Sequence, residues 1–505
     1  MASAATYPTD VKTLHFMLDE QRQLIESLKA NLHRLLKWQF GPKSEHINVD
    51  QLGLFVDGSV VIEVPASAPT DYPERSNTSS ATGERRRAVR VLCNLPRVIE
   101  EIDVPETQKI CPCCGDAMSR FGHEASEQLH YIPARLEVHE TRRRKYSCGR
   151  CHGAVVRAPR LVLPPIPKSM ASASLLAYLI VSKFADGLPL FRIAGRLRRL
   201  GIELSHTLMS EWLMQCYPLL EDLHRRMMRK VLDSGHIYTD DTTLPLQNDD
   251  PARRTTVEGK LWVYATDHRH GPPLIVYKFS RSRSRDAPLT VLADYRGYVQ
   301  ADAYPGYDPL FLTGKIIEVA CNVHARRKFV VAADLLQKPG RPHEALAFYR
   351  ELFRIERRIK DWSDEERLRE RQEKTVPLLA LFKAWLDHAV HTVLPKDTFG
   401  IAVNYALKHW EALTNFTKAG HLDASNNYAE RCMRPVAVGR KAFLFVGSEG
   451  AGHAAAIYYS LVESCKANKV NPLTYLPYVL ANARNKSITL PTPDEFTASN
   501  IAHVG

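Results

Sequence analysis

The sequence predicts a multidomain α+β protein, on three observations. The chain has 505 residues, and at about 150 residues per domain that length suggests three or four domains. Hydrophobic residues make up 45% of the chain and charged residues 25%, which is ordinary globular usage and argues against a disordered, collagen-like or membrane-bundle chain. Heptad spacing, cysteine pairs, helical periodicity and strand-like segments also follow one another along the chain, as in a protein built from several modules.

The charge balance favours a polyanionic partner. Lysine and arginine number 68 against 56 aspartates and glutamates, which gives a net charge of +12, and nucleic acid is the usual partner of such a chain. Charge alone is weak evidence, because many basic proteins bind nothing charged. No stretch approaches the roughly 20 uncharged apolar residues of a bilayer span, and we see no secretory signal pattern, so we expect no membrane segment and a cytoplasmic location.

Residues 1–42 are predicted to form a coiled-coil helix that dimerises the chain. Apolar residues there alternate at spacings of three and four, as in the a/d seam of a coiled coil, with Gln21 as the one polar seam residue. Gly41 and Pro42 end the pattern. The alternative is one amphipathic helix that packs on its own protein. Residues 43–100 follow as a partly disordered linker, because much of this segment has too little apolar content to fold.

Residues 101–160 are predicted to form a zinc-binding module. A Cys-x-x-Cys turn lets two thiolates reach one ion, and two such turns complete a closed, tetrahedral site for one structural Zn²⁺. The gap between the two pairs is longer than usual, and Cys113 competes with its neighbour Cys114. The alternative is a set of buried free thiols. The predicted zinc ligands are Cys111, Cys114, Cys148 and Cys151.

Residues 161–225 are predicted to form a helix-turn-helix-like DNA-binding region. We expect one helix at 174–183, a second at 190–200 that ends at Gly201, and a third that begins after Ser205 as its N-cap. Helix, glycine-containing turn and helix is the helix-turn-helix pattern, although an ordinary helical hairpin reads the same way. The second helix carries the basic residues that we expect to contact DNA, Arg192, Arg196, Arg198 and Arg199.

Residues 226–470 change to a strand pattern. Strand-like segments lie at 236–245, 260–266, 274–279, 297–304 and 315–320, with a helical stretch at 288–295. Three antiparallel strands, a helix and two further strands describe a ribonuclease-H-like α/β domain. Charged, helical sequence from about 335 to 420 suggests a helical insertion into this domain, and we expect residues 471–505 to be a C-terminal tail.

Three acidic residues of this domain are candidate metal ligands. Asp240 and Asp302 lie at strand positions, and Glu430 lies in a helical segment with Ser425 or Asn426 as its N-cap. Phosphoryl transfer with two metals needs carboxylates that converge on cations about 3.5–4 Å apart. Spacing alone leaves other interpretations open. Asp240 can be a polar residue at a strand end, and Glu430 can pair with a basic residue one turn away on its own helix.

Several motifs, in order along nearly the whole chain, resemble the transposases of the insertion-sequence 66 family. They are residues 238–242, 299–307, 320–329, 426–431 and 439–445, together with the heptad, the cysteine pairs and the helices from 167 to 212. The chain departs from the family pattern at Ser425, before the Asn-Asn pair, and at Ala442-Phe443. Neither departure touches the three acids.

The resemblance implies a DDE transposase that uses two divalent metal ions, normally Mg²⁺ with Mn²⁺ as the substitute. Carried over residue by residue, the catalytic and metal-binding triad is Asp240, Asp302 and Glu430. The family pattern selects Asp240 over Asp241, and since adjacent strand residues point to opposite faces, only one of the two can face the metals. The family order also places His324 near the site, as a phosphate or water contact or as a structural helix residue.

The implied activity is binding of an element's terminal inverted repeats, 3′-end cleavage and strand transfer into target DNA. Expected partners are DNA, a second copy of the chain and accessory proteins of the same element, in the bacterial nucleoid. The alternatives are a DNA-binding regulator with an inactive domain and a nuclease or resolvase that cuts without joining. Further candidates for phosphate contacts, unless they only line a solvated helix face, are Arg326, Arg327, Lys328, Arg440 and Lys441.

Overall fold

The computed structural model describes residues 103, 113, 116–117, 136–147, 155–158, 163–248, 255–336 and 338–497. The chain divides into two compact units, one formed by Met1–Gly41 with His139–Gly505 and the other by Pro42–Val138. The predicted coiled-coil helix, the linker and the four predicted zinc ligands lie outside the described residues. Cys113, the competing cysteine, is described and exposed.

Two short strands lie on either side of the second cysteine pair in the sequence. Strands β1 (Lys145–Ser147) and β2 (Val155–Arg157) are antiparallel, and Ser147 pairs with Val155. Cys148 and Cys151 lie between them, outside the described residues.

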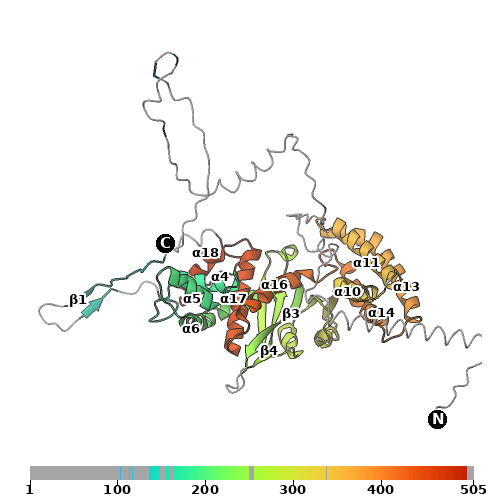
Figure 1. Ribbon diagram of the computed structural model, residues 1–505, viewed down its shortest axis with the longest axis horizontal. Helices are drawn as coiled ribbons and strands as arrows, with labels where there is room; N and C mark the ends of the chain where they lie inside the picture. Colours follow the sequence, from blue (N-terminus) through green and yellow to red (C-terminus); the bar gives the residue numbers. More distant parts are fainter. Residues whose placement is uncertain are drawn as a thin grey trace, which may run out of the picture. The chain divides into compact units, whose positions relative to one another are not determined.

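A five-stranded mixed sheet forms the centre of the larger unit (Figure 1). Its strand order is β5-β4-β3-β6-β7; β3, β4 and β5 are antiparallel, whereas β6 and β7 run parallel to β3. Each strand lies within a few residues of its predicted segment. The strands are β3 (His236–Gln247), β4 (Thr256–Ala265), β5 (Ile275–Ser280), β6 (Gly297–Ala301) and β7 (Ile316–Ala320).

Two glycines set the parallel pairing at the start of β3 and β6. Gly297 has φ +137°, a conformation that side chains rarely adopt, and a Cβ there would lie 2.3 Å from the carbonyl oxygen of Gly235. The adjacent Tyr298 N–H donates to that oxygen at 2.9 Å. The two strand starts are therefore held together at a point where only glycine fits, which fixes the register of both strands up to their ends.

The helices of the predicted DNA-binding region share a core with the sheet instead of forming a domain of their own. Ser205 caps α6 as predicted, accepting a hydrogen bond from the Leu208 N–H. On α7, His224 Nε2 lies 3.0 Å from the Tyr277 carbonyl oxygen of β5. These helices are α4 (Ala173–Phe184), α5 (Leu190–Arg199), α6 (His206–Cys216), η2 (Tyr217–Leu220) and α7 (Glu221–Leu232).

Three later helices complete this core: α16 (Asn427–Phe443), α17 (Glu449–Ala467) and α18 (Pro472–Asn482). β5 is an edge strand, and an edge leaves backbone N–H groups unpaired. Ser460 and Ser464 of α17 accept hydrogen bonds from two of these groups, on Tyr277 and Ile275. Helix α17 therefore closes this edge of the sheet.

The predicted helical insertion lies between β7 and α16, and Figure 1 shows α11, α13 and α14 grouped beside α10. Its helices are α10 (Asn322–Ala333), α11 (Arg341–Arg358), α12 (Asp364–Glu370), η5 (Arg371–Thr375), α13 (Val376–Val390), α14 (Thr398–Lys408), α15 (Trp410–Thr414) and η6 (Asn415–Lys418). Besides packing on one another, these helices contact the sheet, because α15 and η6 pack on its edge strand β7. Shorter elements elsewhere in the chain are η3 (His268–His270), α8 (Asp286–Leu292), η4 (Pro305–Tyr307) and α9 (Asp308–Phe311).

The segment from residue 471 differs from the predicted tail, because it contains α18. This helix packs against α4, and its side chains Tyr475, Leu476, Val479 and Leu480 are fully buried. The helical pattern is short and contains Pro472 and Pro477, so sequence periodicity alone does not separate it from a tail. Among the helices of the described ranges, none is long and apolar enough to cross a membrane.

We expect Leu480→Ala to lower the free energy of unfolding by about 2–5 kcal/mol, because it leaves a cavity between α18 and α4. Leu473→Ala is the matched control: Leu473 lies on the same helix but is 49% exposed, so its loss should cost about 0.5 kcal/mol or less. Urea unfolding followed by tryptophan fluorescence measures both variants. Equal effects of the two would show that α18 does not belong to the core.

Candidate active site

The pairing of β3 with β6 brings Asp240 and Asp302 together. Tyr238 pairs with Gln300 in parallel register, and each aspartate lies two residues beyond that pair, on the same face as its predecessor. Asp302 directly follows β6, and its Oδ1 accepts a hydrogen bond from the Tyr304 N–H at 3.1 Å. Between them Ala303 has φ +60°, a left-handed conformation that costs a non-glycine residue about 1–3 kcal/mol and is typical of functional turns.

Helix α16 brings Glu430 to the same place. Asn426 precedes the helix in the predicted N-cap position, but its side chain makes no capping hydrogen bond. Its Nδ2 donates instead to the backbone oxygen of Thr239 at 2.9 Å, and its N–H donates to Cys321 Sγ at 3.2 Å. Part of the capping prediction was therefore wrong: Asn426 fastens the first turn of α16, which carries Glu430, to the strand residue next to Asp240.

The three half-buried carboxylates repel one another. Burial, then the charge of Asp302 and after it that of Glu430, raise the pKa of Asp240 from its ordinary 3.8 to about 8, against a hydrogen bond from the Asp241 N–H that lowers it. Glu430 Oε1 is buried and has no hydrogen-bond partner among the described residues. Like charges brought together out of water need a compensating positive charge.

The neighbouring Asp241 has that compensation from the protein itself. Its Oδ1 lies 2.8 Å from Arg283 Nη2, and its Oδ2 lies 3.5 Å from Lys260 Nζ. Its contacts are on the other face of β3, as the strand alternation predicts. Arg283 also stacks on the Tyr304 ring, 4.1 Å from its centroid, and its Nη2 lies 3.8 Å from Asp302 Oδ2. This arginine, which the sequence analysis missed in a run of Ser and Arg, therefore joins the two faces.

A cation at the carboxylates fits the donor set. Oxygen ligands are those that Mg²⁺ and Mn²⁺ prefer. The site offers them from three elements, β3, the turn after β6 and α16, and at least one of these oxygens is buried without a partner. Among the described residues, the donor atoms that lie within 4.8 Å of one another belong to Cys321, His324 and Glu430. Asp240 and Asp302 are not in that group, so the three acids as joint cation ligands stay a prediction.

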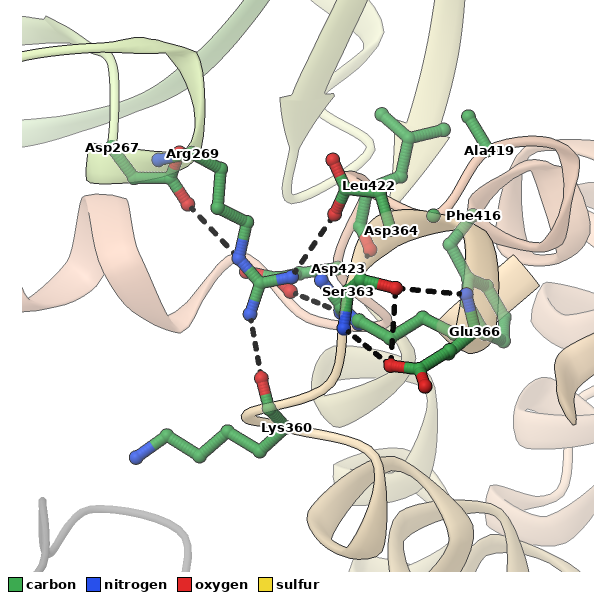
Figure 2. A network of polar contacts seen from close by, with 12 residues as sticks. Asp267, Arg269, Lys360, Ser363, Asp364, Glu366, Phe416, Ala419, Leu422 and Asp423 are labelled. Carbon is green, nitrogen blue, oxygen red and sulfur yellow. Dashed lines mark hydrogen bonds and ion pairs between the residues drawn. The ribbon is translucent and has the colours of Figure 1, made fainter. Parts of the chain in front are cut away.

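A polar network ties the helical insertion to β3. The Asp423 carboxylate accepts from Arg367 Nη2 at 3.0 Å and from the Tyr238 hydroxyl at 2.8 Å. Figure 2 shows Asp423 beside Leu422, and Arg269 reaching from the sheet to the backbone of Lys360, to which it donates at 3.0 Å. Tyr238 lies two residues before Asp240. The insertion therefore supports the strand that carries the first acid.

A second contact from the insertion reaches the other aspartate. Tyr405 on α14 donates from its hydroxyl to the backbone oxygen of Asp302 at 3.4 Å. Lys328 on α10 lies over the same ring, 4.4 Å from its centroid. Neither Asp423 nor Tyr405 shows a sequence signal, because both act through contacts with residues far away in the chain.

The predicted basic residues fall into two groups. Arg440 Nη1 donates to Thr242 Oγ1 at 3.0 Å and to the Thr243 backbone oxygen at 2.6 Å, so this guanidinium fastens α16 to β3 and is not a free phosphate contact. Arg326 and Lys328 are half-buried on α10. The exposed members, which remain accessible to a phosphate, are Arg192, Arg196, Arg198, Arg199, Arg327 and Lys441.

Asp240→Asn is expected to stabilise the protein near pH 8 when no divalent cation is added. Because the folded-state pKa of Asp240 is raised to about 8, its contribution to stability is present below about pH 4 and is lost as the pH rises toward 8, by about 1.4 kcal/mol per pKa unit. Thermal unfolding of parent and variant from pH 5 to pH 8 should show a gap that widens with pH. Asp361→Asn, at an exposed position, should show a constant gap, and the same result for Asp240→Asn would contradict the repulsion.

Family models and relatives agree on what this chain is similar to. A model described as "Transposase IS66 family" matches residues 168–454, one described as "zinc-finger binding domain of transposase IS66" matches residues 108–152, and one described as "Transposase C of IS166 homeodomain" matches residues 27–99. The first match contains all three acids.

Two uncharacterized proteins of Sinorhizobium fredii extend the similarity over nearly the whole chain. Protein y4jD is 32% identical, over 96% of this chain and 94% of its own length. Protein y4hP is 31% identical, over 92% of this chain and 87% of its own length. With more than half of the chain matched by the transposase model and the zinc-finger model matched upstream, the chain belongs to the IS66 family of transposases.

Proposed function

We propose that this chain is a DDE transposase that binds the terminal inverted repeats of its element, cleaves the 3′ ends and transfers them into target DNA. The observation that carries the proposal is the convergence of Asp240, Asp302 and Glu430 from two parallel strands and one helix, close enough that two of the charges raise the pKa of the third. Carboxylates gathered against their repulsion are typical of a centre that binds cations.

The sheet supports a ribonuclease-H-like catalytic domain. The sequence pattern predicts three antiparallel strands, a helix and two further strands for that fold, and a sheet with three antiparallel and two parallel strands in the order β5-β4-β3-β6-β7 is consistent with it. In such a sheet the first and fourth strands are neighbours. This neighbourhood supports a shared site for Asp240, within β3, and Asp302, directly after β6, although they are 62 positions apart in the sequence.

Two divalent cations, Mg²⁺ or Mn²⁺, would activate the attacking water or DNA 3′-hydroxyl and stabilise the charge on the leaving oxygen. The chain's own residues hold the cations and orient the elements around them. The three carboxylates bind, Asn426 and Arg440 fix α16 on β3, and Arg283 places a positive charge beside Asp302 for a DNA phosphate. Cleavage and joining are both in-line displacements at phosphorus, so the same three carboxylates serve both, mainly by positioning and charge neutralisation.

DNA binding is assigned to the segments before the catalytic domain. The four arginines of α5 are exposed, as the salt-dependent contacts to phosphate require, and α5, Gly201 and α6 form the helix-turn-helix. Cys111, Cys114, Cys148 and Cys151 bind one structural Zn²⁺, and the N-terminal heptad associates two chains. The zinc-finger match over residues 108–152 supports the second of these assignments.

The rival functions are a DNA-binding regulator and a nuclease that cuts without joining. An inactive relic would tolerate loss of the acids, and all three are present. An assay with pre-nicked element ends and a target plasmid separates the three functions, because the regulator leaves both DNAs intact, the nuclease only cuts, and the transposase joins.

Asp240→Asn, Asp302→Asn and Glu430→Gln should each lower cleavage and joining by at least about 10³-fold, or about 4 kcal/mol of barrier, because each keeps the shape and removes a charge that a cation needs. Binding to the element ends should survive. The three losses should not add, since one already disables the cation pair. Gel assays of cleavage, joining and end binding measure all three properties.

Asp241→Asn is the matched control, since its side chain faces the other side of β3 and an amide oxygen still accepts from Arg283. It should stay within about tenfold of the parent, or about 1.4 kcal/mol. Activity lost in Asp241→Asn and retained in Asp240→Asn would show that the other face of the strand carries the chemistry. Activity within tenfold in Glu430→Gln would remove Glu430 from the triad.

A further inference from the structure

His324 and Glu430 face each other across the start of two helices. His324 lies in the first turn of α10 and Glu430 in the first turn of α16. His324 Nδ1 lies 3.7 Å from Glu430 Oε1, which is too long for a hydrogen bond. Both atoms are buried, and neither has a hydrogen-bond partner among the described residues. Two buried polar atoms that point at each other without bonding need a third group between or beside them.

The separation suits a shared cation. Donor atoms that each lie about 2.1 Å from one Mg²⁺ or Mn²⁺ lie about 3–4 Å from one another. A ring nitrogen of His324, a carboxylate oxygen of Glu430 and Cys321 Sγ also lie within 4.8 Å of one another. The region therefore gathers a nitrogen, an oxygen and a sulfur donor at one point.

The thiol is the member of this cluster that is already used. Cys321 is fully buried and its Sγ accepts the Asn426 N–H at 3.2 Å, so it anchors the start of α16. Mg²⁺ and Mn²⁺ also prefer oxygen and nitrogen to sulfur. His324 and Glu430 are therefore the members of the cluster that would bind the cation.

The position of His324 is fixed independently of any ligand. Asn322, two residues earlier, donates two hydrogen bonds. Its N–H donates to the Ala424 backbone oxygen at 3.0 Å, and its Nδ2 donates to the Leu413 backbone oxygen at 2.9 Å. The start of α10 is therefore held between the insertion and the segment before α16. A ligand on a pre-set helix turn binds without first ordering its backbone.

We propose that His324 Nδ1 is a fourth protein ligand of the metal centre, which binds a divalent cation together with Glu430. This inference rests on the proposed function and adds a ligand that the three-acid pattern lacks. An imidazole ligand raises the preference of a site for Mn²⁺ over Mg²⁺ relative to carboxylates alone. The centre is thus a mixed oxygen and nitrogen site on the Glu430 side.

Electron spin-echo spectroscopy of Mn²⁺ bound to the full, zinc-loaded chain tests the ligand directly. The parent should show ¹⁴N modulation from one bound imidazole, and His324→Gln should lose it. Mn²⁺ affinity of His324→Gln, from the free-Mn²⁺ signal, should fall by about tenfold or more, with a smaller change for Mg²⁺. His409→Gln is the control for removal of an imidazole, because its ring packs on Tyr405 and should leave the modulation unchanged.

The outcomes separate this inference from the proposed function. Parent protein that binds Mn²⁺ in an Asp240-dependent manner without ¹⁴N modulation overturns the His324 ligand and leaves the triad intact. Modulation that persists in Asp240→Asn with unchanged affinity supports the His324 ligand and overturns the triad. The spectrum of the parent protein alone can overturn the proposal, so the test still decides if His324→Gln does not fold.

Discussion

Repulsion among three carboxylates is the constraint on which the rest of this structure depends. Asp240, Asp302 and Glu430 come from separate elements and meet at a half-buried place, where burial and the two neighbouring charges raise the pKa of Asp240 to about 8. Left to itself, such a cluster would spread apart or take up protons. The fold must therefore hold the acids by contacts that do not use the carboxylates themselves, and in the proposed function a bound cation supplies the missing charge.

Those contacts come from every element around the site. Asn426 and Arg440 bind α16 to β3 at two places, one on each side of Glu430. Asp423 links Tyr238 of β3 to the buried Arg367 of the insertion. The insertion is thus a support for the site rather than an appendage, and two of its helices, α15 and η6, also pack on the edge strand β7. Tyr238, Arg367 and Arg440 lie on regular helices or strands, so the groups that Asp423 and Asn426 contact are already ordered by the fold.

Much of the sheet was predictable from the sequence, and the supports were not. Strand segments bounded by turn residues located β3 and β6 to within a few residues, and Ser205 capped its helix as the local pattern indicates. In the sequence Asn426 has the pattern of an N-cap, but its side chain donates to the backbone oxygen of Thr239 on β3. Arg440 lies in a basic segment, and its guanidinium likewise donates to a backbone oxygen of β3, that of Thr243. Such contacts depend on which residues, distant in the sequence, the fold brings together, and local sequence patterns do not predict them.

Anomalous scattering from crystals grown with Mn²⁺ tests the central claim most directly, because it locates the cations without relying on activity. We predict two peaks about 3.5–4 Å apart, within ligand distance of Asp240, Asp302 and Glu430. Peaks that avoid Asp240, or a single peak elsewhere with the three carboxylates unligated, would contradict the account.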